Sequence, residues 1–271
     1  MPELPEVEIV RRALAKTIVG KEIASFEVIR TPGKPVRTLQ GISEEEFRDA
    51  VIGEAFTDMT RKGKFIIAPL TSGKTVIFHF MLSGWLDYFQ NEGQIGERER
   101  RYARLKFAFT SGQILLFTDP RNMGRVFLVE DEDFTQLGVL ARLGIEPLSL
   151  DFTIDRFSDI IAKTPGKAIK DLLTDQEKIA GIGNIYSDEI LRRAGVRPDR
   201  QVGTLTGTEV EKLHYAIPEV LKDAIAEIEA GKEEHMLAWR KKGRSCPDCG
   251  GEVVAEKRGA SHYYWCPRCQ K

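Results

Sequence analysis

The sequence predicts an α+β protein in which a helix and an N-terminal antiparallel β-sandwich are followed by a helical part and a small cysteine-rich ribbon. Three observations support this fold class. Apolar stretches typical of strands fill residues 20–140, helical periodicity follows residue 153, and all four cysteines lie between residues 246 and 269. A chain of 271 residues is long enough to bury one large core or two medium ones.

The first twenty residues predict a helix that docks on a core. Pro5 suits the first position of a helix, and Gly20 supplies a C-terminal stop. An apolar stripe at spacings of three and four runs along this segment, formed by Val7, Val10, Leu14 and Ile18. The chain shows no export signal and no stretch long enough to cross a membrane, so we expect a soluble, intracellular protein.

Pro2 allows two interpretations. Many chains begin with Met-Pro for no chemical reason. If Met1 is removed, however, Pro2 becomes a secondary amine, and because α-amino groups titrate near pH ~8, a useful fraction of it is a neutral nucleophile. Glu3 stands beside it and could move protons.

Four stretches between residues 20 and 140 are typical of strands: KFIIAPL, TVIFHFML, RLKFAF and QILLFT. Turn pairs such as Ser72-Gly73 and Ser111-Gly112 separate them, which favours a pair of antiparallel sheets. The basic turn TRKGKF, which contains Lys64, is by default solvated. TDPRNMG is another turn, with Arg121 and Met123 near its apex. His79 is by default an ordinary, partly buried strand histidine.

Helical periodicity marks four later segments, near residues 154–162, 167–173, 184–194 and 209–229. Thr206 and Glu209 form a capping box before the last of these, and Pro218 interrupts it and can kink it. We expect a β domain over residues 1–142, a linker over 143–152, a helical domain over 153–238 and a finger over 239–271. The stretch GIGN at 181–184 is either a simple connecting turn or a turn whose backbone amides hold a phosphate.

The cysteines follow the pattern C-x2-C-x16-C-x2-C, at Cys246, Cys249, Cys266 and Cys269. This spacing is typical of a zinc ribbon, and we favour one zinc ion over a pair of disulfides because every cysteine belongs to a paired knuckle. Four thiolates leave no open coordination position, so the metal is expected to be structural. Between the knuckles we expect a β-hairpin whose turn, at 257–259, presents Arg258.

Charge is unevenly distributed along the chain. The whole sequence has 40 Lys and Arg against 41 Asp and Glu, a net charge of −1. Residues 240–271 contain eight basic and three acidic residues, a net of +5. A basic C-terminal module on a mildly acidic body suits binding to a polyanion.

Taken together, these motifs resemble the formamidopyrimidine-DNA glycosylase family, which is related to endonuclease VIII. The resemblance extends over the whole chain. It rests on five motifs in the right order: MPELPEVE, RKGKF, TDPR, DQEKIAGIGNIYSDE and the terminal CPRCQK. It implies that the helical domain is a helix-two-turn-helix domain and that the N-terminal domain is the catalytic one.

The resemblance implies four catalytic residues. Pro2 would be the nucleophile that attacks C1′ of a damaged nucleoside, and Glu3 would be the acid and base that serves the sugar. Glu6 would help to position the terminus, and Lys64 would contact a phosphate beside the lesion.

The resemblance also implies residues that bind DNA. Asn184 and Arg258 would grip the phosphates of an extruded nucleotide, and Lys170 would lie near the same backbone. Where the family fills the gap in the duplex with Met, Arg and Phe, this chain offers Leu82, Arg121 and Met123. His79 completes the expected DNA-binding set.

The function that follows is a base-excision-repair glycosylase with abasic-site lyase activity, acting as a monomer in the bacterial cytoplasm on double-stranded DNA with damaged bases or abasic sites. Two alternatives stay open: an endonuclease VIII-like enzyme for oxidised pyrimidines or bulky adducts, and a damaged-DNA-binding protein without activity. The segment before Cys246, GKEEHMLAWRKKGRS, is short for the family, which normally has there a loop that covers 8-oxoguanine.

Overall fold

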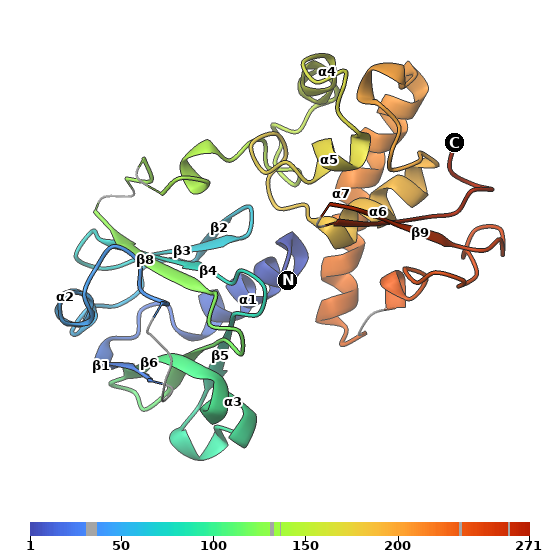
Figure 1. The fold of residues 1–271 in the computed structure, drawn as a ribbon. Helices are drawn as coiled ribbons and strands as arrows, with labels where there is room; N and C mark the ends of the chain where they lie inside the picture. The colour runs from blue at the N-terminus through green and yellow to red at the C-terminus, as the bar shows by residue number, and fades with distance from the viewer. Residues whose placement is uncertain (31–36, 131–132, 136, 233–234, 260) are drawn as a thin grey trace. The chain divides into compact units, whose positions relative to one another are not determined.

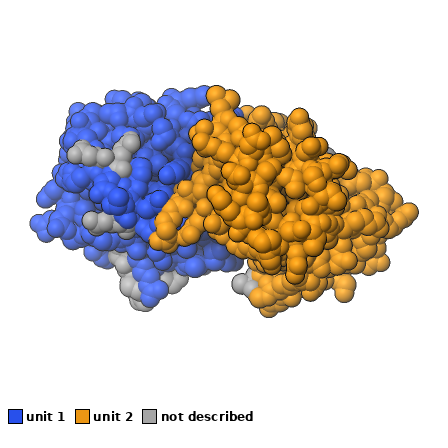
Figure 2. All heavy atoms as spheres, turned by 90° about the horizontal axis from the view of Figure 1, so that it is seen from above, with its two compact units in different colours: residues 1–2, 7–141 blue, residues 3–6, 142–271 orange. Residues whose placement is uncertain are grey.

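The computed structural model describes residues 1–30, 37–130, 133–135, 137–232, 235–259 and 261–271, and confirms the α+β class (Figure 1). The chain forms two compact units (Figure 2). The first comprises residues 1–2 and 7–141, and the second comprises residues 3–6 and 142–271. The four-part division at residues 142, 152 and 238 stays a prediction.

The first unit contains two antiparallel four-stranded sheets, with strand orders β1-β6-β7-β5 and β2-β3-β4-β8. The strands are β1 (Ile23–Val28), β2 (Thr60–Lys62), β3 (Phe65–Pro69), β4 (Thr75–His79), β5 (Trp85–Phe89), β6 (Ala103–Phe109), β7 (Ile114–Thr118) and β8 (Arg125–Val129). Phe78 of one sheet lies edge-on to Phe107 of the other, with ring centroids 6.3 Å apart. One continuous apolar core therefore joins the two sheets, as expected for a sandwich.

The N-terminal helix α1 (Leu4–Thr17) forms as its sequence predicts. Its apolar stripe is buried in the core of the first unit, with Val7 and Ile18 both 0% exposed. Gly20 follows the helix at φ +78°, a backbone conformation that glycine adopts without strain. The first turn of this helix, residues 4–6, belongs to the second compact unit.

Two helices of the first unit were not expected, α2 (Glu44–Val51) and α3 (Glu97–Tyr102). A capping box formed by Ser43 and Glu46 begins α2, and Phe47 and Val51 bury its apolar face. The pattern Ser-x-x-Glu at 43–46 was the available signal for this helix. Helix α3 buries no residue, so no apolar periodicity marks it.

The second unit contains the expected helices, α4 (Ile154–Ala162), α5 (Ile169–Leu173), α6 (Asn184–Ala194) and α7 (Gly207–Glu229). The capping box of Thr206 and Glu209 is present at the start of α7. Pro218 lies inside α7, which is continuous through it, and a kink at this residue stays a prediction. Leu213, Ile217 and Leu221 are buried along this helix, which packs on α6, and this packing offsets the backbone hydrogen bond that proline lacks.

The ribbon of the second unit contains the antiparallel strands β9 (Val254–Arg258) and β10 (Ser261–Trp265). Four short 3-10 turns complete the described elements: η1 (Glu92–Gln94), η2 (Leu140–Arg142), η3 (Val202–Thr204) and η4 (His235–Leu237). Among the described helices, none combines the length and the apolar character that a membrane span requires.

Three arginines surround the Glu8 carboxylate of helix α1, two from the helix itself and one, Arg61, from β2. Glu8 accepts hydrogen bonds from Arg11 at 2.8 Å, from Arg12 at 2.8 Å and from Arg61 of β2 at 3.1 Å. Burial by itself raises the pKa of Glu8. The surrounding guanidinium groups outweigh burial and hold this pKa at about 2, below its ordinary value of 4.5.

We predict that Glu8→Gln lowers the free energy of unfolding by roughly 2 kcal/mol at pH 7, because the hydrogen bonds lose their charge. Because the pKa of Glu8 is lowered in the folded state, the contribution of its charge to the free energy of unfolding is complete above pH 4.5 and is lost as the pH falls toward 2. Urea unfolding at pH 7 and pH 3 measures this. The exposed strand residue Glu27, changed to Gln, is the matched control. An equal effect of the two substitutions at pH 7 would contradict the prediction.

Candidate functional site

The Glu3 carboxylate caps the N-terminus of helix α6. It accepts hydrogen bonds from the backbone N–H groups of Gly183 at 2.7 Å, Ile185 at 2.8 Å and Tyr186 at 3.3 Å. Glu3 itself is only 1% exposed. A carboxylate at this position satisfies N–H groups that have no partner within the helix and interacts favourably with the positive end of the helix dipole.

This contact changes the interpretation of the turn at residues 181–184. The sequence left open whether its backbone amides hold a phosphate. In the structure three of the amides around this turn are bound to Glu3. The turn therefore positions an acidic side chain through these amides.

The turn is shaped by a close approach of helix α1. Leu4 N–H donates to the Gly181 carbonyl at 3.0 Å, and Gly181 has φ +86°. A Cβ atom at Gly181 would lie 2.7 Å from Leu4 Cδ1, so only glycine fits here. The side chain of Gln176 also holds the turn. Its Oε1 atom accepts a hydrogen bond from the Gly181 N–H at 3.0 Å, and its Nε2 atom donates one to the Ile182 carbonyl at 2.6 Å.

Glu6 supports Glu3 from within the same helical turn. Its carboxylate accepts from the Glu3 backbone N–H at 2.8 Å and from the Tyr186 hydroxyl at 2.6 Å. Burial raises the pKa of Glu6, while the hydrogen bond from Tyr186 opposes this rise. Glu6 thus links the backbone at Glu3 to helix α6, which agrees with the positioning role implied by the resemblance.

Pro2 immediately precedes this arrangement and is partly buried, whereas Met1 is 48% exposed. With Met1 attached, the nitrogen of Pro2 is an amide and cannot act as a nucleophile. Removal of Met1 would convert it into a secondary amine, one residue away from the fixed Glu3 carboxylate.

Lys170 is buried, although the resemblance implies a DNA contact. Its side chain is 1% exposed, and its ammonium group donates to Asp188 at 2.5 Å and to the His262 carbonyl at 2.6 Å. It also lies 4.8 Å from the centre of the Tyr263 ring. Burial lowers the pKa of Lys170, and Asp188 opposes this shift. In this structure Lys170 joins α5 and α6 to the ribbon and does not present its charge at the surface.

Asp188, on helix α6, is fully buried and has a second cationic partner. Arg240 donates to it at 2.8 and 3.0 Å, and also to the Asn184 carbonyl at 3.1 Å. The Asn184 side-chain oxygen is buried and has no hydrogen-bond partner within the described part of the chain. Arg240 therefore connects the segment before Cys246 to the residue that is expected to grip a phosphate.

Arg258 is the last residue of β9, one position before the hairpin turn. The expected turn at 257–259 is displaced, because Arg258 pairs with Ser261 in the strand ladder and Gly259 follows at φ +57°. Two carboxylates hold the Arg258 guanidinium, Glu256 at 2.9 Å and Asp199 at 3.2 Å. A phosphate would have to compete with these groups.

In the first unit, Lys64 immediately precedes β3, whose first residue, Phe65, pairs with His79 of β4. Lys64 is 8% exposed and follows Gly63, which has φ +56°, in the turn between β2 and β3. His79 stacks on Phe65 with ring centroids 4.2 Å apart. Burial, together with the charges of Lys64 and Arg125, lowers the pKa of His79 to about 4, so its ring is neutral at pH 7.

The three residues expected to fill a gap in DNA are all exposed on two loops of the first unit. Leu82 is 38% and Met123 is 40% exposed, and Arg121 is exposed beside Met123. Asp119, a buried carboxylate that the sequence did not identify, accepts from backbone groups of one of these loops.

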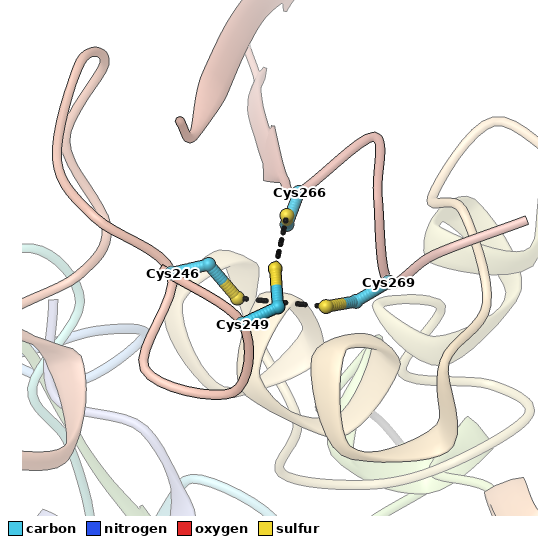
Figure 3. A group of neighbouring side chains, drawn as sticks. All are labelled: Cys246, Cys249, Cys266 and Cys269. Carbon is cyan, nitrogen blue, oxygen red and sulfur yellow. Dashed lines mark hydrogen bonds between the residues drawn. The ribbon is translucent and has the colours of Figure 1, made fainter. Parts of the chain in front are cut away.

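The four cysteines bring their sulfur atoms together at the base of the hairpin (Figure 3). All four lie within 4.8 Å of one another, with Cys246 and Cys269 3.8 Å apart and Cys249 and Cys266 3.6 Å apart. Such a cluster of four thiols, drawn from two knuckles, fits a tetrahedral zinc ion.

The ribbon is also attached to the end of helix α6. Gln270 accepts from the Cys266 N–H at 2.8 Å and donates to the Val196 carbonyl at 2.9 Å. The zinc knuckle and the helical part are thereby joined through one buried side chain.

Sequence reasoning missed Asp188, Glu189, Trp239 and Arg240. Glu189 is 1% exposed and accepts from Trp239 Nε1 at 2.7 Å. The available signal was the pair of acidic residues at 188–189 inside the periodic pattern of helix α6. A buried carboxylate requires cationic or N–H partners, and the basic, aromatic segment before Cys246 was a candidate source.

Three domain families match successive parts of the chain. They are the formamidopyrimidine-DNA glycosylase N-terminal domain over residues 1–126, the formamidopyrimidine-DNA glycosylase H2TH domain over residues 143–234, and a zinc finger found in FPG and IleRS over residues 245–271. The order of these matches follows the order expected from the sequence motifs.

Full-length relatives and solved structures show the same similarity. The formamidopyrimidine-DNA glycosylase of Desulfitobacterium hafniense is 36% identical, and that of Streptococcus pneumoniae is 34% identical, over 100% of this chain and at least 99% of each relative. The structure of Lactococcus lactis Fpg with FAPY-dG containing DNA has a TM-score of 0.86 and 28% identity, and covers 99% of this chain and 100% of that chain. MutM with carbocyclic 8-oxo-G containing DNA has a TM-score of 0.86 and 30% identity, with 100% of both chains covered.

We predict that Cys249→Ser abolishes the binding of one zinc ion and exposes the backbone of β9 and β10 to exchange, because a small ribbon has little core without its metal. Zinc content by elemental analysis and hydrogen exchange by mass spectrometry measure the two effects. Arg258→Ala in the same hairpin is the control and should retain zinc. A Cys249→Ser protein whose hairpin stays protected would contradict the prediction.

Proposed function

The chain belongs to the formamidopyrimidine-DNA glycosylase family, and we propose that it removes damaged bases from double-stranded DNA and then cleaves the strand with Pro2 as its nucleophile. Its glycosylase activity follows from the family. The lyase step, the covalent intermediate and the roles of individual residues are our proposal. The observation that supports it most strongly is the Glu3 carboxylate, which three backbone N–H groups fix directly beside Pro2.

The proposed reaction begins after removal of Met1. The nitrogen of Pro2 attacks C1′ of the nucleoside, and the bond between C1′ and the base breaks. Protonation of the ring oxygen opens the sugar and leaves a cationic iminium between Pro2 and C1′. This iminium withdraws electrons, so loss of a C2′ proton expels the 3′ phosphate, and a second elimination expels the 5′ phosphate. Hydrolysis of the iminium releases the sugar fragment and restores the amine.

Glu3 is the proposed acid and base in these steps. Backbone N–H groups of the turn fix the Glu3 carboxylate. The neighbouring Glu6 fixes the Glu3 backbone by accepting a hydrogen bond from its N–H group. The fixed carboxylate can take the proton that the Pro2 nitrogen loses on attack, give it to the ring oxygen, and later take the C2′ proton, all without a costly rearrangement of the side chain. Tyr186 holds Glu6 and so contributes to the placement of Glu3.

We assign DNA binding to several side chains. Lys64, Asn184 and Arg258 would contact phosphates around the extruded nucleotide, whereas buried Lys170 would position α6 and the ribbon. His79, neutral at pH 7, would act as a hydrogen-bonding group and not as a cation. Leu82, Arg121 and Met123 would fill the space that the nucleotide leaves.

The zinc ion, when bound by its four cysteines, keeps the hairpin of Arg258 folded. With four sulfur ligands it has no open position for substrate, so its contribution is structural. We further propose that the protein acts as a monomer, in the cytoplasm, and associates with the nucleoid through DNA.

The first prediction concerns the nucleophile. Borohydride should trap the protein covalently on abasic-site DNA, and mass spectrometry should place the adduct on Pro2. An additional residue before Pro2 should abolish trapping, because the nitrogen then stays an amide. Pro5→Ala, which alters the second Pro-Glu pair and leaves the terminal amine intact, is the matched control. An adduct on a lysine, or no adduct, would reject the assignment and favour a non-catalytic damaged-DNA-binding protein.

The second prediction concerns the lesion. The segment before Cys246, GKEEHMLAWRKKGRS, is short for the family, which normally has there a loop that covers 8-oxoguanine. Recognition of 8-oxoguanine requires donors and acceptors placed closely around the base, whereas an opened ring or a missing base is already poorly stacked. We therefore expect efficient cleavage at abasic sites, useful excision of formamidopyrimidine or oxidised pyrimidine bases, and slow excision of 8-oxoguanine.

Single-turnover excision from matched duplexes that differ only in the lesion measures this preference. Equal rates for 8-oxoguanine and formamidopyrimidine guanine would contradict it. Faster excision of oxidised pyrimidines than of formamidopyrimidines would favour the endonuclease VIII-like alternative.

A further inference from the structure

Two loops of the first unit are joined by one buried carboxylate. The first loop follows β4 and contains Leu82 and Ser83, and the second follows β7 and contains Arg121 and Met123. Asp119, at the start of the second loop, is 0% exposed. Its Oδ1 atom accepts a hydrogen bond from the Ser83 hydroxyl, which belongs to the first loop.

The same carboxylate organises the backbone of the second loop. Asp119 Oδ1 accepts from the Arg121 N–H at 3.1 Å, and Oδ2 accepts from the N–H groups of Met123 and Gly124, each at 2.6 Å. Ser83 Oγ also accepts from the Arg121 N–H at 3.2 Å. The donors of both loops thus converge on one charged group.

Both loops also rest on the ring of Phe117, which is fully buried in the core. A Cβ atom at Gly124 would lie 2.6 Å from Phe117 Cζ, and one at Gly84 would lie 2.9 Å from the same atom. The glycines therefore let the two backbones approach the core closely. Asn122, at φ 55°, provides the sharp turn between Arg121 and Met123.

This arrangement keeps large apolar side chains exposed. Leu82 and Met123 are 38% and 40% exposed, although burial in the core would be favourable for each. A flexible loop could fold such residues inward, and ordering it during DNA binding would cost conformational entropy. A loop that is already held in place avoids that cost.

We propose that Asp119 and Ser83 are positioning residues that hold Leu82, Arg121 and Met123 as one preassembled wedge for the DNA duplex. The inference rests on the proposed function, because it assigns these three side chains to the gap left by an extruded nucleotide. It adds that the two loops act together, and that the hydrogen bond between Ser83 and Asp119 makes them do so.

The test compares Ser83→Ala with Ser83→Thr, which keeps the hydroxyl, and with Thr118→Val. Thr118 donates to Asp87 at 2.9 Å one residue before Asp119, so its loss removes a hydrogen bond to a carboxylate without touching either loop. Excision is measured on a duplex and on the same lesion in an unpaired bubble, where no wedge is needed. A 2-aminopurine base opposite the lesion reports unstacking by its fluorescence.

Ser83→Ala should slow excision from the duplex roughly tenfold, the factor expected when one hydrogen bond to a charged group is lost. It should also reduce the 2-aminopurine signal, and the bubble substrate should restore the rate. Ser83→Thr and Thr118→Val should stay within about twofold of wild type on both substrates. Asp119→Asn should act in the same direction as Ser83→Ala and more strongly.

Two results would overturn the inference: a Ser83→Ala rate on the duplex equal to that of Thr118→Val, or a defect that persists in the bubble. Wild-type protein inactive on both substrates would instead overturn the proposed function. The 2-aminopurine signal would still test the wedge in that case, because it reports insertion without chemistry.

Discussion

The carboxylate of Glu3, bound to three backbone N–H groups at the start of helix α6, is the interaction on which the candidate site depends. It brings the N-terminal residues 3–6 into the second compact unit, although most of helix α1 belongs to the first. Gly181 and Glu6 serve the same contact, one by allowing Leu4 to approach and the other by holding the Glu3 backbone. The fold therefore positions an acidic side chain next to Pro2, the proposed nucleophile.

A second buried carboxylate, Asp188, also connects segments of the second unit. Lys170 and Arg240 neutralise it, and through them helix α5 and the segment before Cys246 are joined to α6. Removing either cation would leave the buried Asp188 charge without its full set of partners and would lower the free energy of unfolding. Both carboxylates connect segments that lie far apart in the sequence. Asn184 and Arg258, which we propose to bind phosphates, are proposed to depend on these connections.

The sequence predicted most elements because their signals are local. Helix α6 ends at a glycine, Gly195, and α7 begins with a capping box, so both were expected close to their observed bounds. The contacts that make the site were not predictable in this way. Glu3 and Gly183 are 180 residues apart, and only the fold brings them together. Lys170 was expected near the DNA backbone from the resemblance alone, and its burial depends on a partner in another helix, Asp188.

The central claim, that Glu3 holds the start of helix α6, can be tested by amide hydrogen exchange of the wild-type protein and of Glu3→Gln. Gln keeps one acceptor oxygen and replaces the other by a donor, so either Ile185 or the pair Gly183 and Tyr186 loses its acceptor and should exchange at least roughly tenfold faster. The amide of Ile190, inside the same helix, should keep its protection. Unchanged exchange at the three N–H groups would contradict the account, since the turn would then be stable without the carboxylate.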